Sequence, residues 1–527
     1  MDRKTLLAMA LCLLVFLGWQ KLMEQKFASH NPAQIQSLTP PPSSTEGSIS
    51  QNSTALVQNA SLQTPSKPKQ ALRQPEQKVT LVTQTGDAIL GDSGSFFLGW
   101  NLKGYKLGIS PDAAGVSMHS VTHEKGEVTL AFDDPNFTYL NDVQGTLSKT
   151  PGGAIWHYED AQVKLTREFQ SSAQQAYIDV QVTAEFKNQA PKFAFISMHA
   201  QGQEKDPEAQ DRHIAYWTNQ SIETIPLGEQ IAQRAIPSPV KYMAATNRYF
   251  LMAMVAKSPL EATGLVQPAG PYIGRMSLSY PLNSKTISIP LRTYFGPKEL
   301  EVLRQVEPTL DHTVDFGWFT LFAYPLLKIL KWLHQFVQNY GVSIIILTLL
   351  LKLITYPLTY KSMKSMKKMS KLQPQLQKIK EKYKDDKETL QRETLTLMRS
   401  QGANPVAGCL PMLIQMPIFF ALYRVLYSSI ELYHAPFALW IRDLSSKDPF
   451  YVTPVLLSGT MFVQQKLTPS TATDPAQQKM MQFMPLIFGV MMINLPSGLT
   501  IYMLVNALAG IVQQMILNKK LDAAPRR

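Results

Sequence analysis

Short runs in which apolar and polar residues alternate dominate the chain between residues 79 and 309. Within residues 178–186, Ile178, Val180 and Val182 alternate with polar side chains. A period of two places the apolar side chains on one face of a β-strand. Similar runs occur at residues 163–169, 192–198, 276–280 and 286–294 and are separated by Gly, Pro and Asp. The pattern predicts an all-β antiparallel sandwich over residues 79–310.

The pattern changes after residue 310, where long apolar stretches replace the short alternating runs. Residues 311–340 combine aromatic and basic side chains in the way that is typical of an amphipathic helix at the bilayer surface. Five apolar stretches of 16 to 22 residues follow, at 341–360, 406–427, 450–465, 480–495 and 499–517. About 20 helical residues cross the hydrocarbon of a bilayer. We expect a polytopic α-helical membrane protein with a five-helix core at 341–517.

The N-terminus carries one more apolar run, from residue 6 to residue 19. Arg3 and Lys4 precede it, as in a secretory signal, but no small-x-small cleavage site follows. Residues 1–27 are therefore predicted to be an uncleaved transmembrane anchor, which brings the expected number of spans to six. Residues 28–78 are rich in Ser, Thr, Gln, Asn and Pro and predict a flexible tether.

The distribution of charge predicts the orientation of these spans. Residues 361–404 carry 12 Lys or Arg against 5 acidic residues, and the tail 518–527 is also basic. The positive-inside rule places these segments and both termini in the cytoplasm and the sandwich on the outer side of the membrane. The net charge of +12 is better explained by this orientation than by binding to nucleic acid.

The basic segment 361–404 has helical spacing with a break near residues 384–386. We interpret it as two antiparallel helices that form a cytoplasmic hairpin. A docking role for this hairpin is a hypothesis, and its exposed cations would be Lys364, Lys367, Lys368, Lys371, Lys378 and Lys380.

A basic residue lies in the middle of the first core span. Thr348, Lys352 and Thr355 follow helical offsets, and with Tyr356 they form one polar stripe on an otherwise apolar helix. A lysine at mid-bilayer costs on the order of 3 kcal/mol unless polar groups or water surround it. The alternative is that Lys352 snorkels to an interface, but from a central position the side chain is too short. The stripe predicts a hydrophilic groove.

Other spans contribute further polar residues. Gln415 is central in the second span, and Tyr502, Asn506 and Gln513 form a stripe on the last span. The fourth span is rich in methionine, including Met484 and Met492, which suits a surface that accepts many sequences.

Candidate chemistry is sparse. The two cysteines, Cys12 and Cys409, lie in apolar stretches, and four histidines of the sandwich region lack metal-ligand spacing. The acid pairs Asp133-Asp134 and Glu159-Asp160 are explained better as solvated turns than as glycosidase carboxylates. We therefore expect no metal, no cofactor and no enzymatic activity.

Residues 311–517 closely resemble the YidC family of membrane protein insertases, which also includes the mitochondrial Oxa and chloroplast Albino proteins. The resemblance rests on six segments in the family's order and spacing, at residues 356–359, 372–374, 415–419, 435–440, 473–475 and 496–499. The anchor, tether and external sandwich are similar to the Gram-negative branch, in which the sandwich has a galactose-mutarotase-like fold without established mutarotase activity.

This resemblance implies a protein of the bacterial inner membrane that inserts and helps to fold other membrane proteins, alone or with the Sec translocon. Lys352 falls at the position of the groove cation, where Gram-negative relatives usually have arginine. The apolar part of the client would slide along the second and fourth core helices, near Met412, Phe419, Met484, Phe488 and Met492. The implied partners are nascent inner-membrane proteins, the Sec translocon, ribosomes with targeting factors, and membrane lipids, with no small-molecule substrate.

Two alternatives remain open at this point. A solute or lipid transporter also needs a polar site at the midplane, although it predicts internal repeats, and none is apparent between the two halves of the core. The sandwich could instead be a membrane-anchored carbohydrate enzyme of the periplasm.

Overall fold

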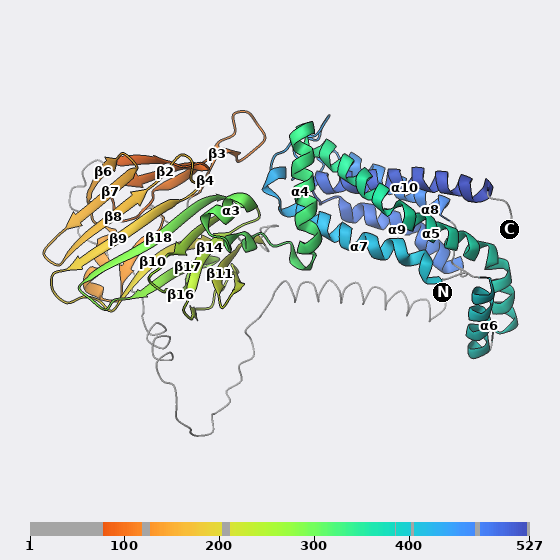
Figure 1. Cartoon of the computed structure of the whole chain (residues 1–527), viewed down its shortest axis with the longest axis horizontal. Coiled ribbons are helices and arrows are strands. Elements are labelled where there is room, and N and C mark those ends of the chain that lie inside the picture. The colour runs from red at the N-terminus through yellow and green to blue at the C-terminus, as the bar shows by residue number, and fades with distance from the viewer. Residues whose placement is uncertain are drawn as a thin grey trace, which may run out of the picture. The chain divides into compact units, whose positions relative to one another are not determined.

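The computed structural model describes residues 77–118, 127–202, 211–384, 386–401, 405–468 and 475–523 (Figure 1). These residues fall into two compact units that are joined between Val314 and Asp315. The predicted N-terminal anchor, the tether up to residue 76 and the last four residues of the basic tail lie outside the described residues.

The first unit consists of antiparallel β-sheets. The largest described sheet has nine strands, which are, in spatial order, β12 (Ser221–Pro226), β11 (His213–Thr218), β14 (Val240–Thr246), β15 (Phe250–Ala256), β18 (Thr286–Pro297), β9 (Ile178–Phe186), β8 (Val163–Gln170), β7 (Gly153–Glu159) and β6 (Thr146–Thr150). A five-stranded sheet has the order β13 (Arg234–Ile236), β16 (Thr263–Gly270), β17 (Ile273–Pro281), β10 (Phe193–Gln201) and β5 (Thr129–Phe132). A four-stranded sheet contains β1 (Lys78–Val82), β2 (Gly86–Gly91), β3 (Gly99–Lys106) and β4 (Gly115–Met118).

The alternation in residues 178–186 corresponds to strand β9. Its apolar residues from Ile178 to Phe186 are buried and the intervening residues are more exposed. Strand β8 alternates in the same way and pairs with β9 so that Val163 lies opposite Phe186. The prediction of half-buried antiparallel strands is confirmed.

The sheets enclose an aromatic core. Phe97, Trp100 and Phe295 are fully buried and their rings lie 5.1 to 5.7 Å apart, centroid to centroid. The five-stranded sheet approaches the nine-stranded sheet so closely that a methyl group at Gly274 would lie 2.9 Å from Ile214. This face-to-face packing makes the unit a β-sandwich.

The C-terminal end of the sandwich extends past the expected boundary at residue 310. Helix α3 (Leu300–Val306) and the 3-10 turn η3 (Leu310–Thr313) follow β18. The Tyr242 hydroxyl donates to the carbonyl of Thr309 at 3.2 Å, and the rings of Trp217 and His312 are 5.0 Å apart. Because these contacts hold the segment to the strands, the predicted start of the amphipathic helix at 311 is corrected to residue 320.

The second unit is helical. Its elements are η4 (Gly317–Phe319), α4 (Thr320–Val337), α5 (Tyr340–Lys382), α6 (Lys387–Ser400), α7 (Pro405–Ser428), η5 (Ile430–Leu432), α8 (Val452–Leu467), α9 (Pro475–Met492) and α10 (Ser497–Ala523). The sandwich additionally contains the 3-10 helix η1 (Pro135–Asn141).

Helices α7, α5, α10, α8 and α9 form a series in which each packs against the next, with α7 and α9 at its ends, and α7 also contacts α10. Helix α4 packs against α5 and α7 and crosses them at a steep angle (Figure 1). Gln338, the residue that follows α4, has the left-handed conformation, and the side chain of Asn339 caps α5 by accepting from Val342 N at 3.1 Å. This cap sets the direction of the corner between the two helices.

Helix α4 has apolar residues on both a packed and an exposed face. Leu326 and Leu330 are buried against the bundle, whereas Trp332 and Phe336 are 54% and 70% exposed. An exposed face of this composition supports the expectation that α4 lies at the bilayer surface.

Helix α5 runs unbroken for 43 residues, through Pro357 and Pro374. A helix of this length measures about 65 Å, roughly twice the hydrocarbon thickness of a bilayer. The expected membrane span and the first arm of the expected hairpin are therefore one helix. The second arm is α6, whose Leu397 and Met398 pack against Leu372 and Leu376 of α5.

By length and hydropathy, two helices among the described residues can cross a membrane, within Tyr340–Lys382 and Ser497–Lys520. Residues 482–492 of α9 form a shorter apolar helix. The number of six spans stays a prediction.

Candidate functional site

The polar stripe predicted for the first core span lies on α5. The hydroxyl of buried Thr348 donates to the carbonyl of Ile344 at 2.6 Å, and that of Thr355 donates to Leu351 at 2.8 Å. Each hydroxyl hydrogen is thus used within the helix, and the oxygen lone pairs remain as acceptors. Half-buried Thr355 can therefore accept from water or a cation, whereas Thr348, at 1% exposure, is enclosed by the bundle.

Lys352 is half-buried on this stripe. The most exposed apolar residues nearby, Leu353 and Ile354, are 71% and 72% exposed and lie on other faces of the helix. No carboxylate of the described ranges forms an ion pair with Lys352. The side chain thus lies on a different face from these exposed apolar residues and has no partner charge among the described residues.

Helices α7 and α10 are linked by a polar contact at the predicted site. The Gln415 side-chain amide donates to the hydroxyl of Tyr502 at 3.0 Å. Tyr502 is only 2% exposed, whereas Gln415 and Asn506 are half-buried. Sequence reasoning placed Gln415 and Tyr502 in one groove, and the structure brings them into direct contact.

The residues predicted to guide the apolar part of a client have different environments. Met484 on α9 is 51% exposed, and Phe419 on α7 is half-buried with its ring 5.4 Å from Phe420. Met492 is 5% exposed and packs with Leu457 and Ala507, and half-buried Phe488 packs against the same cluster. The side chain of Met412 lies outside the described residues. Met492 is therefore buried in the packing of α8, α9 and α10.

Five of the six lysines predicted for the docking hairpin are exposed, namely Lys364, Lys368, Lys371, Lys378 and Lys380. The exception is Lys367, whose ammonium donates to the carbonyl of Asn518 on α10 at 3.0 Å. This contact holds α5 against α10, so Lys367 has a packing role within the bundle.

Sequence reasoning did not single out Asp448, which lies in the loop before α8. The carboxylate is 1% exposed and accepts hydrogen bonds from Trp440, Phe450 and Thr453. An Asp that precedes a helix by a few residues often accepts from the backbone N–H two positions later, in an Asx turn. Asp448, Phe450 and the start of α8 have this spacing, and it could have identified Asp448 as a structural residue.

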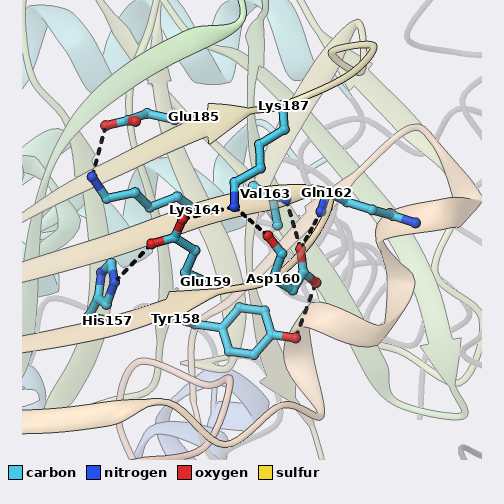
Figure 2. Close-up of polar contacts among 9 residues, drawn as sticks. All are labelled: His157, Tyr158, Glu159, Asp160, Gln162, Val163, Lys164, Glu185 and Lys187. Atoms are coloured by element: carbon cyan, nitrogen blue, oxygen red, sulfur yellow. Dashed lines mark hydrogen bonds and ion pairs between the residues drawn. The ribbon is translucent and has the colours of Figure 1, made fainter.

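In the sandwich, the acid pair Glu159-Asp160 forms the turn between β7 and β8 (Figure 2). Asp160 accepts from the backbone N–H groups of Gln162 at 2.7 Å and Val163 at 2.8 Å, and from the Tyr158 hydroxyl at 3.1 Å. Glu159 accepts from the Lys187 ammonium at 2.8 Å. Both carboxylates are thus engaged in holding the turn.

The electrostatics of this turn argue against glycosidase chemistry. Burial alone would raise the pKa of Asp160, but hydrogen bonds from the Tyr139 hydroxyl and from two backbone N–H groups outweigh it and lower the pKa. The Lys187 ammonium lowers the pKa of Glu159. A glycosidase needs one carboxylic acid with a raised pKa. The other acid pair, Asp133-Asp134, also has a structural role. Asp133 accepts from Phe193 N at 2.9 Å and Asp134 caps η1.

Asp160→Asn is expected to lower the unfolding temperature of the sandwich at pH 7 by about 2–4 °C. The folded pKa lies below the unfolded value of about 3.9, so the carboxylate stabilises the fold above that pH and the effect disappears as pH falls through the folded pKa. Thermal unfolding of the purified chain at pH 7 and pH 3 measures this. Exposed Glu168→Gln on β8 is the control, and equal effects of both substitutions at pH 7 would contradict the assignment.

Groups of three or more His, Cys, Asp or Glu that could bind a metal ion are absent from the described part of the chain. The two units instead define a class of protein, namely a helical membrane protein that carries a large antiparallel β-sandwich.

Comparisons with known proteins narrow this class to a family. A family model described as the 60Kd inner membrane protein matches residues 332–524, and a model of the YidC periplasmic domain matches residues 156–329. The membrane protein insertase YidC of Maridesulfovibrio salexigens is 31% identical over 551 residues, which cover 98% of each chain. That of Geobacter metallireducens is 47% identical over 282 residues, 53% of this chain and 52% of the relative. This chain therefore spans about half the length of the Geobacter relative.

Among solved structures, an active YidC insertase is 18% identical and covers 84% of this chain and 92% of its own, with a TM-score of 0.35. A galactose mutarotase-like protein from Lactobacillus casei is 9% identical and covers 42% of this chain and 100% of its own, with a TM-score of 0.29. The mutarotase-like topology of the sandwich stays a prediction.

The chain belongs to the YidC family of membrane protein insertases. Membership of this family supports the expectation that the chain is not an enzyme.

Proposed function

We propose that this chain inserts and helps to fold inner-membrane proteins, alone or beside the Sec translocon. The observation that carries the proposal is Lys352, a half-buried cation without an ion-pair partner in the described ranges, on a helix that is long and apolar enough to cross the membrane. Such a charge is costly in lipid and marks a functional site.

Lys352 would attract the polar, often acidic, outward-bound segment of a client. The acceptor oxygen of Thr355 and the side chain of Gln415, both half-buried, would hold water around the cation and the passing segment, with buried Tyr502 keeping Gln415 in place. A wet groove shortens the hydrocarbon path and so lowers the barrier for polar residues. Energy would come from partitioning of the apolar segment and from the membrane potential, about 2.3 kcal/mol per charge per 100 mV.

The apolar segment of the client would meet the ends of the helix series, α7 and α9. Phe419 and exposed Met484 support this route, and Met412 and Phe488 are proposed with them from the family resemblance. Met492 is left out because it is buried. The exposed lysines of the α5–α6 hairpin are proposed to dock ribosomes or targeting factors on the cytoplasmic side, and both termini are proposed to lie on that side.

A photo-reactive amino acid at Gln415 tests the proposal. We expect it to crosslink to a nascent inner-membrane protein during synthesis, because Gln415 lines the proposed groove. Leu353, which is 71% exposed on another face of α5, is the matched control and should label lipid instead. Adducts at Gln415 with small solutes, and none with nascent chains, would favour a transporter.

A further inference from the structure

The loop between η5 and α8 is organised around one buried carboxylate. Asp448 Oδ1 accepts from the Trp440 indole N–H and from Phe450 N, both at 3.0 Å. Asp448 Oδ2 accepts from the backbone N–H and the hydroxyl of Thr453, at 2.7 and 2.8 Å. All four contacts bring a donor to an oxygen, and at 1% exposure little water can compete.

This arrangement requires a carboxylate. An asparagine in the same place has one oxygen and one amide nitrogen, and the nitrogen is only a donor. Whichever way the amide is turned, its nitrogen faces two donors, either those of Thr453 or those of Trp440 and Phe450. The site therefore distinguishes Asp from Asn, although the two side chains have nearly the same shape.

The network extends from the loop to the last helix of the bundle. The hydroxyls of Thr453 on α8 and Thr500 on α10 lie 3.0 Å apart and both are buried. Because Thr453 gives its hydrogen to Asp448, Thr500 is the donor in this contact, in exchange for its alternative hydrogen bond to the Ser497 carbonyl at 3.0 Å. The loop also receives the start of α10, because Ser497 N donates to the carbonyl of Ser446 at 2.7 Å and Gly498 N donates to that of Leu444 at 2.9 Å. Asp448 thus joins the N-terminal ends of α8 and α10 through one set of hydrogen bonds.

The N-terminal end of α10, which this network holds, lies close in sequence to the proposed groove. Tyr502, which receives the hydrogen bond from Gln415, follows Thr500 by two residues on α10. Since a helix transmits the position of its first turn to the next, fixing Thr500 also fixes the height and rotation of Tyr502.

We propose that Asp448 is a positioning residue that locks the N-terminal ends of α8 and α10 together, closes this end of the bundle and holds Tyr502 in reach of Gln415. The inference rests on the proposed function for its consequence, because an unlocked end would disturb the groove. The lock itself is a property of the fold and can be measured without a client.

The test uses the full-length chain in native membranes, with Cys12 and Cys409 changed to serine and Leu499→Cys as reporter. Leu499 is 1% exposed in the first turn of α10, and its side chain is not part of the hydrogen-bond network. Asp448→Asn is expected to raise the rate of labelling by a soluble maleimide about tenfold or more, because buried bonds to a charged acceptor are lost. Equal labelling in Asp448→Asn and the parent would overturn the proposal.

Arg442→Gln is the control from the same loop. Arg442 is exposed and its side chain is outside the hydrogen bonds that join the loop to α8 and α10, so its substitution should leave labelling unchanged. If Asp448→Asn fails to accumulate, Thr453→Val replaces it. That variant should also raise labelling, whereas Thr453→Ser keeps the hydroxyl and should stay at the parent rate.

Insertion assays on the same variants, without the Leu499→Cys reporter, separate the positioning role of Asp448 from the proposed insertase function. Asp448→Asn should lower the insertion rate at saturating client about fivefold or more, while crosslinking of the client at Gln415 persists. A merely structural role would lower the amount of protein in the membrane and leave the rate per molecule unchanged. If the unmodified chain inserts nothing, the proposed function fails, and the labelling result still decides whether Asp448 is a lock.

Discussion

Lys352→Glu is expected to reduce the insertion of clients with acidic external segments more than tenfold. The substitution turns attraction into repulsion, and two unit charges 5 Å apart interact by about 3 kcal/mol at an effective dielectric constant of 20. Lys352 is half-buried and has no ion pair among the described residues, so no neighbouring carboxylate softens the change. Protease protection of a newly synthesised client in membrane vesicles measures the insertion.

Two controls test whether the sign of the charge at residue 352 causes the effect. Lys352→Arg keeps the cation and should insert the same clients at a rate close to that of the parent chain. A client whose external segment carries no acidic residue should be affected much less by Lys352→Glu, since no charge meets the new carboxylate. Insertion of acidic clients by Lys352→Glu at the parent rate would remove the proposed role of this residue.

Gly153→Ala is expected to destabilise the sandwich by about 3 kcal/mol or more, which is the upper range for overpacking. A methyl group at Gly153 would lie 1.7 Å from the carbonyl oxygen of Phe169, which belongs to the neighbouring strand β8. Backbone atoms of a paired strand cannot move aside without breaking the ladder. Limited proteolysis and thermal unfolding of the full chain report the loss.

The preceding residue offers a matched control. A methyl group at Gly152 would meet nothing within 4 Å, so Gly152→Ala adds the same atom one position earlier without a clash. It should leave the unfolding temperature nearly unchanged. If Gly153→Ala and Gly152→Ala unfold at the same temperature, close packing between β7 and β8 is not the reason for glycine at 153.

Much of the fold could be predicted because burial on one side imposes a period on the sequence. Strand β9 alternates because one of its faces is buried, and that regularity is visible in the sequence without any partner. The break between the arms of the hairpin was visible in the same way, since α5 ends at Lys382 and α6 begins at Lys387. Lys352 stood out because a charge in a run of leucines is costly wherever the helix lies in the membrane.

The candidate site was only partly predictable. Offsets of three and four residues placed Thr348, Lys352 and Thr355 on one face of a helix, but offsets do not tell which other helix that face meets. The hydrogen bond between Gln415 and Tyr502 joins residues 87 positions apart. Met492 was placed among the client contacts by the family resemblance, and the structure packs it against Leu457 and Ala507.

By itself the sequence determined which segments are strands and which are helices, where charge accompanies apolar spans, and that a cation lies within one of them. These features depend on neighbours a few residues away along the chain. Only the tertiary structure decided that Asp448 joins Trp440 and Thr453 and, through Thr453, reaches Thr500. The reason is that a buried polar group is stabilised by whichever donors the fold brings to it, and those donors leave no periodic signal in the sequence.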